Sequence, residues 1–522
     1  MTIKQNIRSK GLFRSGEVVV RSMVSSQLAC ILTAIVPQFV IILNSLIVSN
    51  MLGMDHFKAV SVFNPITGMI LLLTGACCLG PSIQAGKAYG ELDIRTADRL
   101  YTLSGIMCVA ISAISALVIF VFKRGILERI STDPAIRDCL YSYINPVSLY
   151  LLLSGGACLL NAFVSASGSV RKVTTAVFVS GLVNVISIYV LVRFFCLGTE
   201  AVGIALCLSA ATNILMLLPA VVGRRFPFKF ITKGLDFATL VKKNIVVWIS
   251  VSSNALSTAI IQFAINIIIL HFLPSDGLFA WGICLIALNV VGYAALGFCD
   301  AFMYTDAFLT GEGDHTGRLK VARSYICELC AVMFLFASAF AIFPDKLAML
   351  FGAGTYEKAG MVRIPLICTA TYAVFNEIFC TFGIFSIQRR PMIKLGYDIV
   401  IAIAVPLLVF LSAILFGRDK LWLGFAVSPV ILASYVAIIS GICRRRDRNL
   451  IPFFLFDKVN DVISLDLSIF YTRNNMAAEM ERIRKFLEIC EIDATLSNKI
   501  ELCCEELINN INNNLIVICS LD

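Results

Sequence analysis

The sequence predicts an all-α membrane protein with twelve transmembrane helices in two pseudo-symmetric six-helix bundles, followed by a short cytoplasmic α/β fragment. Hydrophobic residues make up 58% of the 522 residues and charged residues only 15%, which is far from the balance of soluble domains. The apolar residues gather in runs long enough for a bilayer core, which takes about 20 residues of helix. A third observation is a charged turn that occurs once in each half of the chain.

The repeated turn reads Gly-Glu-Leu-Asp at residues 90–93 and Gly-Glu-Gly-Asp at residues 311–314. Other landmarks recur at nearly the same offset of about 220 residues: Pro146 with Pro365, and Arg171 with Arg390. A single period of nearly half the chain indicates two similar lobes, and in parallel-repeat membrane proteins the binding site lies between them.

Apolar runs place the spans near 25–48, 58–80, 99–122, 141–164, 174–197, 201–223, 246–272, 278–304, 324–344, 362–386, 396–416 and 421–443. The first lobe is therefore predicted at 1–223 and the second at 246–445. A cytoplasmic connector at 224–245 would join them, and residues 446–522 would form a cytoplasmic tail. The connector alternates phenylalanines with lysines, which predicts a segment lying along the membrane surface.

The basic residues predict the orientation of the spans. Lys and Arg are concentrated in the even-numbered connections, including Lys87, Arg318 and Lys394, although Lys123 and Arg124 form an exception in an odd-numbered one. The positive-inside rule then places both termini in the cytoplasm of a multi-pass plasma (cytoplasmic) membrane protein. Because these charges sit in short loops between apolar runs, the formal charge of +9 does not indicate nucleic-acid binding.

The nineteen cysteines lie mostly inside apolar segments and are interpreted as packing residues. Cys327 and Cys330 have CxxC spacing, but neither a second pair nor a histidine lies nearby in the sequence, so no metal site is expected. The histidines His56, His271 and His315 lie near span ends or in loops and support neither a metal site nor a nucleophile. We expect no catalytic residues and no bound cofactor.

Polar side chains inside the spans mark a candidate cavity, because each one costs free energy in hydrocarbon unless it meets water or a partner. On the seventh span, a polar band turns by about 120° from Asn254 to Asn266 at 100° per residue, wide enough to line a cavity. Hydrogen bonding between helices is the alternative. The candidate cavity residues are Asn44, Asn184, Asn254, Gln262, Asn266 and Asn289.

Two acids at membrane depth are the candidate ion-coupling residues. Glu377 lies in the middle of the tenth span and Asp300 toward the cytoplasmic end of the eighth, while Glu328 lies closer to a span end. A carboxyl group in such surroundings can hold a proton or a cation, depending on which way the cavity opens. A purely structural hydrogen-bonding role is the alternative. The first lobe carries no acid at mid-membrane, so coupling there would have to use amides alone.

Several motifs resemble the multidrug and toxic compound extrusion (MATE) family. They are Asn-Ser-Leu-Ile-Val-Ser-Asn-Met-Leu-Gly at 44–53, the turn at 85–93, Gly-Thr-Glu-Ala-Val-Gly-Ile-Ala at 198–205 and the second-lobe loop at 311–314. The resemblance covers nearly all of residues 20–445. It implies twelve helices in two bundles, alternating access, and export driven by inward movement of Na⁺ or protons.

The chain departs from that family at two positions. The family often carries an aspartate on the first span, where this chain has Asn44, and a second acid on the fifth span, where it has Ile188. Proton coupling through the first lobe is therefore not implied. Glu377 matches the tenth-span region where some members hold a cation-binding acid, so the resemblance implies coupling through the second lobe.

The tail resembles the N-box helix of the GHKL ATPase fold, as in anti-sigma-factor kinases. The pattern predicts a strand at 462–470 and helices at 474–490 and 497–514, and the resemblance places Glu506 and Asn510 as an incomplete nucleotide site. The glycine-rich segments of that fold are missing before Asp522. An ordinary amphipathic helix with Glu and Asn at i and i+4 is the alternative.

The sequence thus favours a secondary active antiporter that exports small amphipathic, cationic compounds. The alternatives are a lipid-linked saccharide flippase, for which Arg193 is the basic candidate, and a membrane sensor with a kinase-like cytoplasmic domain. The expected partners are a small-molecule substrate and the lipid bilayer, without nucleic acid, and the expected state is a monomer. The coupling ion is expected to be Na⁺ or H⁺.

Overall fold

The computed structural model describes residues 2–130, 134–223, 226–231, 237–273, 276–349, 356–456, 473–489, 493 and 496–506. The chain divides into two compact units. We call Met23–Asp457 the membrane body, and Met1–Ser22 with Lys458–Asp522 the terminal unit.

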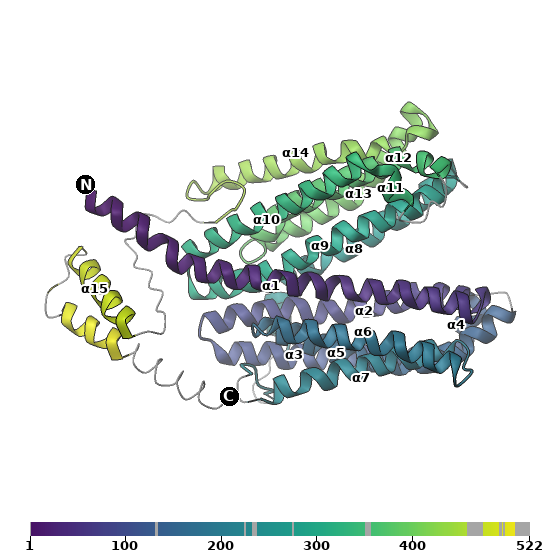
Figure 1. Ribbon diagram of the computed structural model, residues 1–522, viewed down its shortest axis with the longest axis horizontal. Helices are drawn as coiled ribbons and strands as arrows, with labels where there is room; N and C mark the ends of the chain where they lie inside the picture. Colours follow the sequence, from purple (N-terminus) through teal and green to yellow (C-terminus); the bar gives the residue numbers. More distant parts are fainter. Residues whose placement is uncertain are drawn as a thin grey trace. The chain divides into compact units, whose positions relative to one another are not determined.

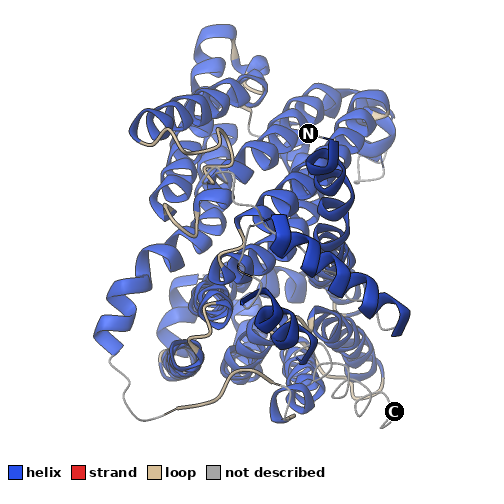
Figure 2. Ribbon diagram, turned by 90° about the vertical axis from the view of Figure 1, so that its left-hand side faces the viewer, coloured by secondary structure: helices blue, strands red, loops and turns tan. Residues whose placement is uncertain are grey.

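The membrane body is built from two six-helix bundles (Figure 1). The first lobe contains the part of α1 (Thr2–Met51) from Met23 onward. Its other helices are α2 (Met54–Gly90), α3 (Ile94–Val121), α5 (Pro134–Ala166), α6 (Val170–Arg193) and α7 (Glu200–Val222), with the short α4 (Lys123–Ile130). The second lobe contains α8 (Phe237–Phe272), α9 (Asp276–Glu312), α10 (His315–Ile342), α12 (Tyr356–Ser386), α13 (Pro391–Phe416) and α14 (Leu423–Arg446), with the short α11 (Pro344–Ala348). These helices run roughly side by side and are seen end on in Figure 2.

Twelve helices of the described chain are long and apolar enough to cross a membrane, which confirms the predicted number. Several extend beyond the predicted spans, because a helix does not have to stop where the hydrocarbon ends. The predicted second span ends at residue 80, whereas α2 continues to Gly90. The predicted eleventh span begins at residue 396, whereas α13 begins at Pro391. Proline is favoured in the first turn of a helix because it lacks the N–H that would be unpaired there.

The repeated turns cap the third helix of each lobe. The Asp93 carboxylate accepts a hydrogen bond from the backbone N–H of Thr96 at 3.1 Å, and Asp314 accepts one from Gly317 at 2.8 Å. Each aspartate therefore satisfies a backbone donor that the helix itself leaves unpaired. The short helices α4 and α11 also occupy equivalent places, each preceding the fourth span of its lobe. The sequence repeat is thus also a repeat of local structure.

We expect Asp93→Ala and Asp314→Ala each to destabilise the protein, by about 0.5–2 kcal/mol as typical for a lost N-cap. Asp314 should show the larger effect, because its hydrogen bond is shorter and it is less exposed. Hydrogen bonds from Thr96 lower the pKa of Asp93 below its ordinary 3.8, so that cap's contribution is lost only as pH falls through the lowered value. Thermal unfolding in detergent measures both changes, and an unchanged melting temperature for Asp314→Ala would argue against the cap.

The two lobes contact each other near the repeated turns, at what we call the turn end of the membrane body. A Cβ atom added to Gly311 would lie 2.9 Å from the Cα of Gly90. Farther along the interface, the Trp248 Nε1–H of α8 donates to Gln84 Oε1 of α2 at 2.8 Å. A Cβ atom on Gly80 would lie 2.7 Å from Cδ1 of the same tryptophan. Glycine at these positions lets helices of opposite lobes approach closely.

An aromatic segment follows the last helix of each lobe. In the first lobe, Phe228 is buried against Tyr101 and Phe163. The backbone N–H of the next residue, Lys229, donates to the Asp98 carboxylate at 2.6 Å. The connector's location along the membrane surface stays a prediction, and its described residues 226–231 pack on α3 and α5. The reason is that its alternate phenylalanines fill an apolar site and its backbone finds hydrogen-bond partners there.

The corresponding segment of the second lobe folds back after α14. Phe453, Phe454 and Phe456 all contact the ring of Phe385 on α12. The guanidinium of Arg318 on α10 lies over the ring of Phe456, 4.3 Å from its centroid. Both lobes therefore end in an aromatic segment that binds their own third and fourth spans together.

The terminal unit contains α15 (Arg473–Ile489), the amphipathic helix predicted at 474–490. Ile483 and Leu487 are buried, as expected for the apolar face. Residues 496–506 are also helical, and Arg484 pairs with Glu501 at 3.0 Å. The predicted strand at 462–470 and Asn510 lie outside the described residues.

Candidate functional site

A cavity of about 770 Å³ lies between the two lobes of the membrane body. Its second-lobe wall comes mainly from α8, α9 and α12, and its first-lobe wall from α2 and α5. The amide and charged side chains on the second-lobe wall are Asn254, Gln262, Asn289, Asp300, Asn376, Glu377 and Lys394. The first-lobe wall has small and apolar residues with Asn161 and Ser165, and none of the described residues that line it is charged. The cavity is therefore electrostatically asymmetric.

Five of the predicted site residues line this cavity: Glu377, Asp300, Asn254, Gln262 and Asn289. These five residues come from α8, α9 and α12 and line the same cavity. Asn266, which was expected to continue the band on α8, is not among the described lining residues. Since a helix turns by 40° over four residues beyond a full turn, the band drifts off the cavity wall after Gln262.

The first-lobe residues Asn44 and Asn184 lie together but away from the cavity. The Asn44 Nδ2–H donates to Asn184 Oδ1 at 2.7 Å, joining α1 to α6. Asn184 is buried, and Ile188 one turn farther belongs to a packed apolar cluster. Both asparagines were predicted to line the cavity, but neither is among its described lining residues. They pair with each other because two amides in an apolar interior offer complementary donors and acceptors.

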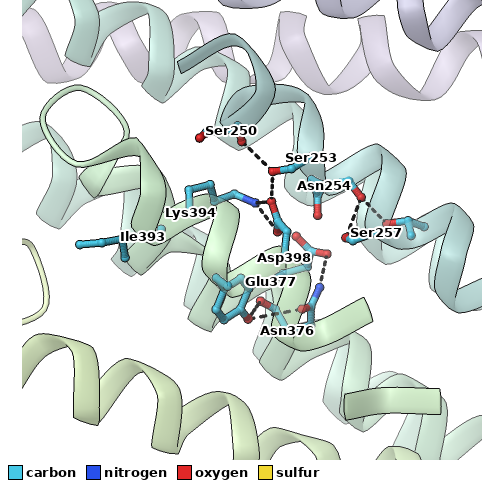
Figure 3. Close-up of polar contacts among 12 residues, drawn as sticks. Ser250, Ser253, Asn254, Ser257, Asn376, Glu377, Ile393, Lys394 and Asp398 are labelled. Carbon is cyan, nitrogen blue, oxygen red and sulfur yellow. Dashed lines mark hydrogen bonds and ion pairs between the residues drawn. The ribbon is translucent and has the colours of Figure 1, made fainter. Parts of the chain in front are cut away.

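Glu377 is held by a short series of hydrogen bonds between α12 and α13. The Asn376 Nδ2–H donates to the Glu377 carboxylate at 3.2 Å. The Tyr397 hydroxyl of α13 donates to the backbone carbonyl of Asn376 at 3.1 Å and lies 3.4 Å from its Oδ1. The Asn376 amide nitrogen thus points toward the Glu377 carboxylate, and its oxygen faces Tyr397. Figure 3 shows Asn376 and Glu377 side by side.

Asp300 lies on α9 in the same cavity. Its Oδ1 atom is buried and has no hydrogen-bond partner within the described part of the chain. An unpaired carboxylate oxygen in low-dielectric surroundings costs free energy. A carboxylate left unpaired beside a cavity is suited to hold a proton or a cation that enters from it.

A buried ion pair borders this site, and sequence reasoning missed it. Lys394 Nζ lies 2.5 Å from both carboxylate oxygens of Asp398, one turn away on α13, and the Ser253 hydroxyl of α8 donates to the same carboxylate. Figure 3 shows both side chains directed at Asp398. Lys394 was predicted to lie in a cytoplasmic loop, but it is only 3% exposed. Its i, i+4 spacing from an acid and the preceding Pro391 were the available signals.

A second buried ion pair lies near the turn end of the second lobe. Arg318, also assigned to a loop from the sequence, donates from Nε to Asp306 Oδ1 at 2.7 Å and from Nη2 to Oδ2 at 3.1 Å. Both residues are 2% exposed. This bidentate pair joins α9 to α10 and does not line the cavity. Its role is therefore structural, because it ties together the helices on either side of the repeated turn.

The remaining predicted residues belong to the terminal unit. Glu506 is exposed in the helix at 496–506, and its proposed partner Asn510 lies outside the described residues. The nucleotide site suggested for the tail stays a prediction.

Comparison with known proteins identifies the architecture. Residues 29–190 match the MatE family model. A MATE transporter in complex with MaD5 has a TM-score of 0.73 at 16% identity, with 84% of this chain and 98% of that chain covered. A mutant of the Vibrio cholerae MATE transporter VcmN has a TM-score of 0.71 at 15% identity, covering 84% and 99%. A multidrug resistance MATE family transporter in an outward-facing conformation has a TM-score of 0.68 at 16% identity, covering 84% and 98%.

None of the curated proteins compared with this sequence matches it. The family match and the shared architecture confirm the predicted fold class of two six-helix bundles.

Proposed function

Because residues 29–190 carry the MatE domain and the membrane body has the fold of MATE transporters, we propose that this protein is a secondary active antiporter that exports small amphipathic, cationic compounds. Export would proceed by alternating access and would be coupled to inward movement of Na⁺ or H⁺. The observation that carries the proposal is the cavity between the lobes, with two acids on its second-lobe wall.

The charges around the cavity favour a cationic substrate. Lys394 is neutralised by Asp398. Asp300 and Glu377 also line the space and have no ion-pair partner in the described chain. When ionised, they give this wall a net negative charge, which attracts a cation and repels an anion. The apolar first-lobe wall would receive the hydrophobic part of the same molecule.

The contacts between the lobes support alternating access. Gly90 with Gly311 and Gln84 with Trp248 hold the two lobes together toward the turn end. The basic residues of the even-numbered connections support a cytoplasmic location for this end by the positive-inside rule. We therefore propose an outward-facing conformation, with both termini cytoplasmic and the protein acting as a monomer in the plasma membrane.

A lipid-linked saccharide flippase is supported less well. Such a cavity needs basic side chains to hold pyrophosphate, and Lys394 is the one Lys or Arg among the described lining residues. Its ammonium group already contacts both oxygens of Asp398. Arg193, the candidate from the sequence, is not among those lining residues.

The decisive test is transport by the purified full-length protein in proteoliposomes. Outward gradients of lipophilic cations such as ethidium should drive measurable uptake of ²²Na⁺ or of protons, while vesicles containing no protein should show neither flux. Anionic dyes of similar size should not drive either flux. If no cation of this class stimulated ion movement, the exporter proposal would be wrong.

A further inference from the structure

We propose that Lys394 determines which ion this transporter can use. Its ammonium group occupies the Asp398 carboxylate, which would otherwise attract an alkali cation. Of the described lining residues, Glu377 and Asp300 keep a carboxyl group outside this ion pair, and the ion that they exchange is the proton. The inference rests on the proposed antiport function and makes it more specific, since the fold alone is compatible with either ion.

The geometry leaves no vacant carboxylate oxygen at Asp398. Lys394 Nζ contacts both oxygens at 2.5 Å, and the Ser253 hydroxyl donates to one of them. Asp398 is 1% exposed and Lys394 is 3% exposed. A Na⁺ ion at this carboxylate would have to displace the ammonium group of Lys394, which is part of the chain and cannot diffuse away. It would also lie beside that cation in a low-dielectric region, where like charges repel strongly.

The fold provides a specific space for this lysine. A Cβ atom on Gly383 of α12 would lie 2.6 Å from the Cδ of Lys394 and 3.2 Å from its Cα. The glycine therefore lets the aliphatic stem of the lysine lie directly against α12. The ammonium group then reaches the Asp398 carboxylate rather than water. The packing of Lys394 against α12 therefore supports the Lys394–Asp398 ion pair.

The other titratable groups around Lys394 come from every neighbouring helix that carries one. They are Cys299 and Asp300 on α9, Glu377 and Cys380 on α12, Tyr397 on α13 and Tyr435 on α14. The residue that α8 presents, Ser253, does not titrate. Of the carboxyl groups in this set, Glu377 and Asp300 remain free of the lysine and open to the cavity.

The surroundings of Glu377 suit a proton better than a metal cation. The Glu377 carboxylate accepts a hydrogen bond from an N–H group of Asn376, whose side-chain carbonyl oxygen faces Tyr397 instead. Na⁺ is a hard cation that binds oxygen atoms, and in this orientation the Asn376 amide presents an N–H group, not an oxygen, to the Glu377 carboxylate. A proton needs a single carboxylate oxygen and no further ligands.

The experiment measures Na⁺ binding and ion-driven transport separately. Saturable ²²Na⁺ binding to the purified full-length protein is compared for the wild type, Lys394→Arg, Lys394→Gln and the double variant Lys394→Gln/Asp398→Asn. Proton-driven and Na⁺-driven export of a lipophilic cation are then measured for each protein in proteoliposomes.

We expect the wild type and Lys394→Arg to bind no Na⁺ saturably and to respond only to the pH gradient. Lys394→Gln should gain saturable Na⁺ binding, because it leaves an unpaired buried carboxylate beside the Ser253 oxygen. The double variant should lose this binding again. If Na⁺ also stimulated export by Lys394→Gln, the freed Asp398 carboxylate would take part in the transport cycle.

Saturable Na⁺ binding or Na⁺-driven export by the wild type would overturn the inference, and this outcome needs no variant to fold. A correctly folded Lys394→Gln protein without Na⁺ binding would overturn it as well. If the exporter proposal is wrong, the wild type will show no ion-driven export. The ²²Na⁺ binding measurements would still test whether Lys394 prevents Na⁺ binding at Asp398.

Discussion

Glu377→Gln is expected to reduce ion-driven export to the background of protein-free vesicles. Glutamine has nearly the same shape and can still accept the hydrogen bond from Asn376 that Glu377 accepts at 3.2 Å. It cannot bind and release a proton or balance a cation, so the ion gradient would lose its link to the substrate. Proteoliposome flux measures this effect, and thermal unfolding should show little change in stability.

A matched control for this variant is Glu328→Gln in the same lobe. Glu328 lies on α10, is partly buried like Glu377, and is not among the described residues that line the cavity. Its carboxylate accepts a hydrogen bond from Ser324 at 2.5 Å within the same helix. We expect this control to retain coupled export. Equal loss in both variants would show that removing any half-buried acid of the second lobe is harmful, and undisturbed export by Glu377→Gln would exclude it as the coupling residue.

Gly90→Ala and Gly311→Ala are each expected to block the transport cycle by preventing closure of the turn end. The added Cβ at Gly311 would lie 2.9 Å from the Cα of Gly90 and from the backbone N of Glu91. Backbone atoms cannot rotate away as a side chain can, so the lobes would have to separate. Export should fall to background, and hydrogen–deuterium exchange should accelerate at the ends of α2 and α9.

Gly86→Ala provides the control for these glycine variants. Gly86 lies on α2 one turn before Gly90, and a Cβ atom there would meet nothing within 4 Å. Helix propensity even favours alanine at this position by about 1 kcal/mol. Normal transport by Gly86→Ala together with loss in the other two variants would assign the effect to the interface between lobes. Normal transport by Gly311→Ala would mean that this close approach is not part of the cycle.

The fold was largely predictable because its main determinants are local in the sequence. A long apolar run indicates each membrane span. The repeated turn contains the aspartate, Asp93 or Asp314, that caps the next helix. Helix ends were less predictable. Charged residues such as Arg318 and Lys394 signal a loop by composition, but a partner one turn or one helix away allowed both to be buried inside helices.

The candidate site was only partly predictable for a related reason. Glu377 and Gln262 stand out because polar residues are rare inside apolar spans, and both line the cavity. Whether a polar residue meets a cavity or another side chain depends on the helix that packs against it. Asn44 and Asn184 illustrate this point, since they lie 140 positions apart and are joined by a hydrogen bond. Neither their pairing nor the rotation of Asn266 away from the cavity can be read from one helix alone.

The uneven charge of the two cavity walls has an electrical consequence. A membrane voltage performs work only on charges, at about 2.3 kcal/mol per elementary charge for each 100 mV. None of the described first-lobe residues that line the cavity carries a charge, whereas the opposite wall contributes Asp300, Glu377 and Lys394. A voltage across the bilayer would therefore act on the described cavity lining through its second-lobe wall.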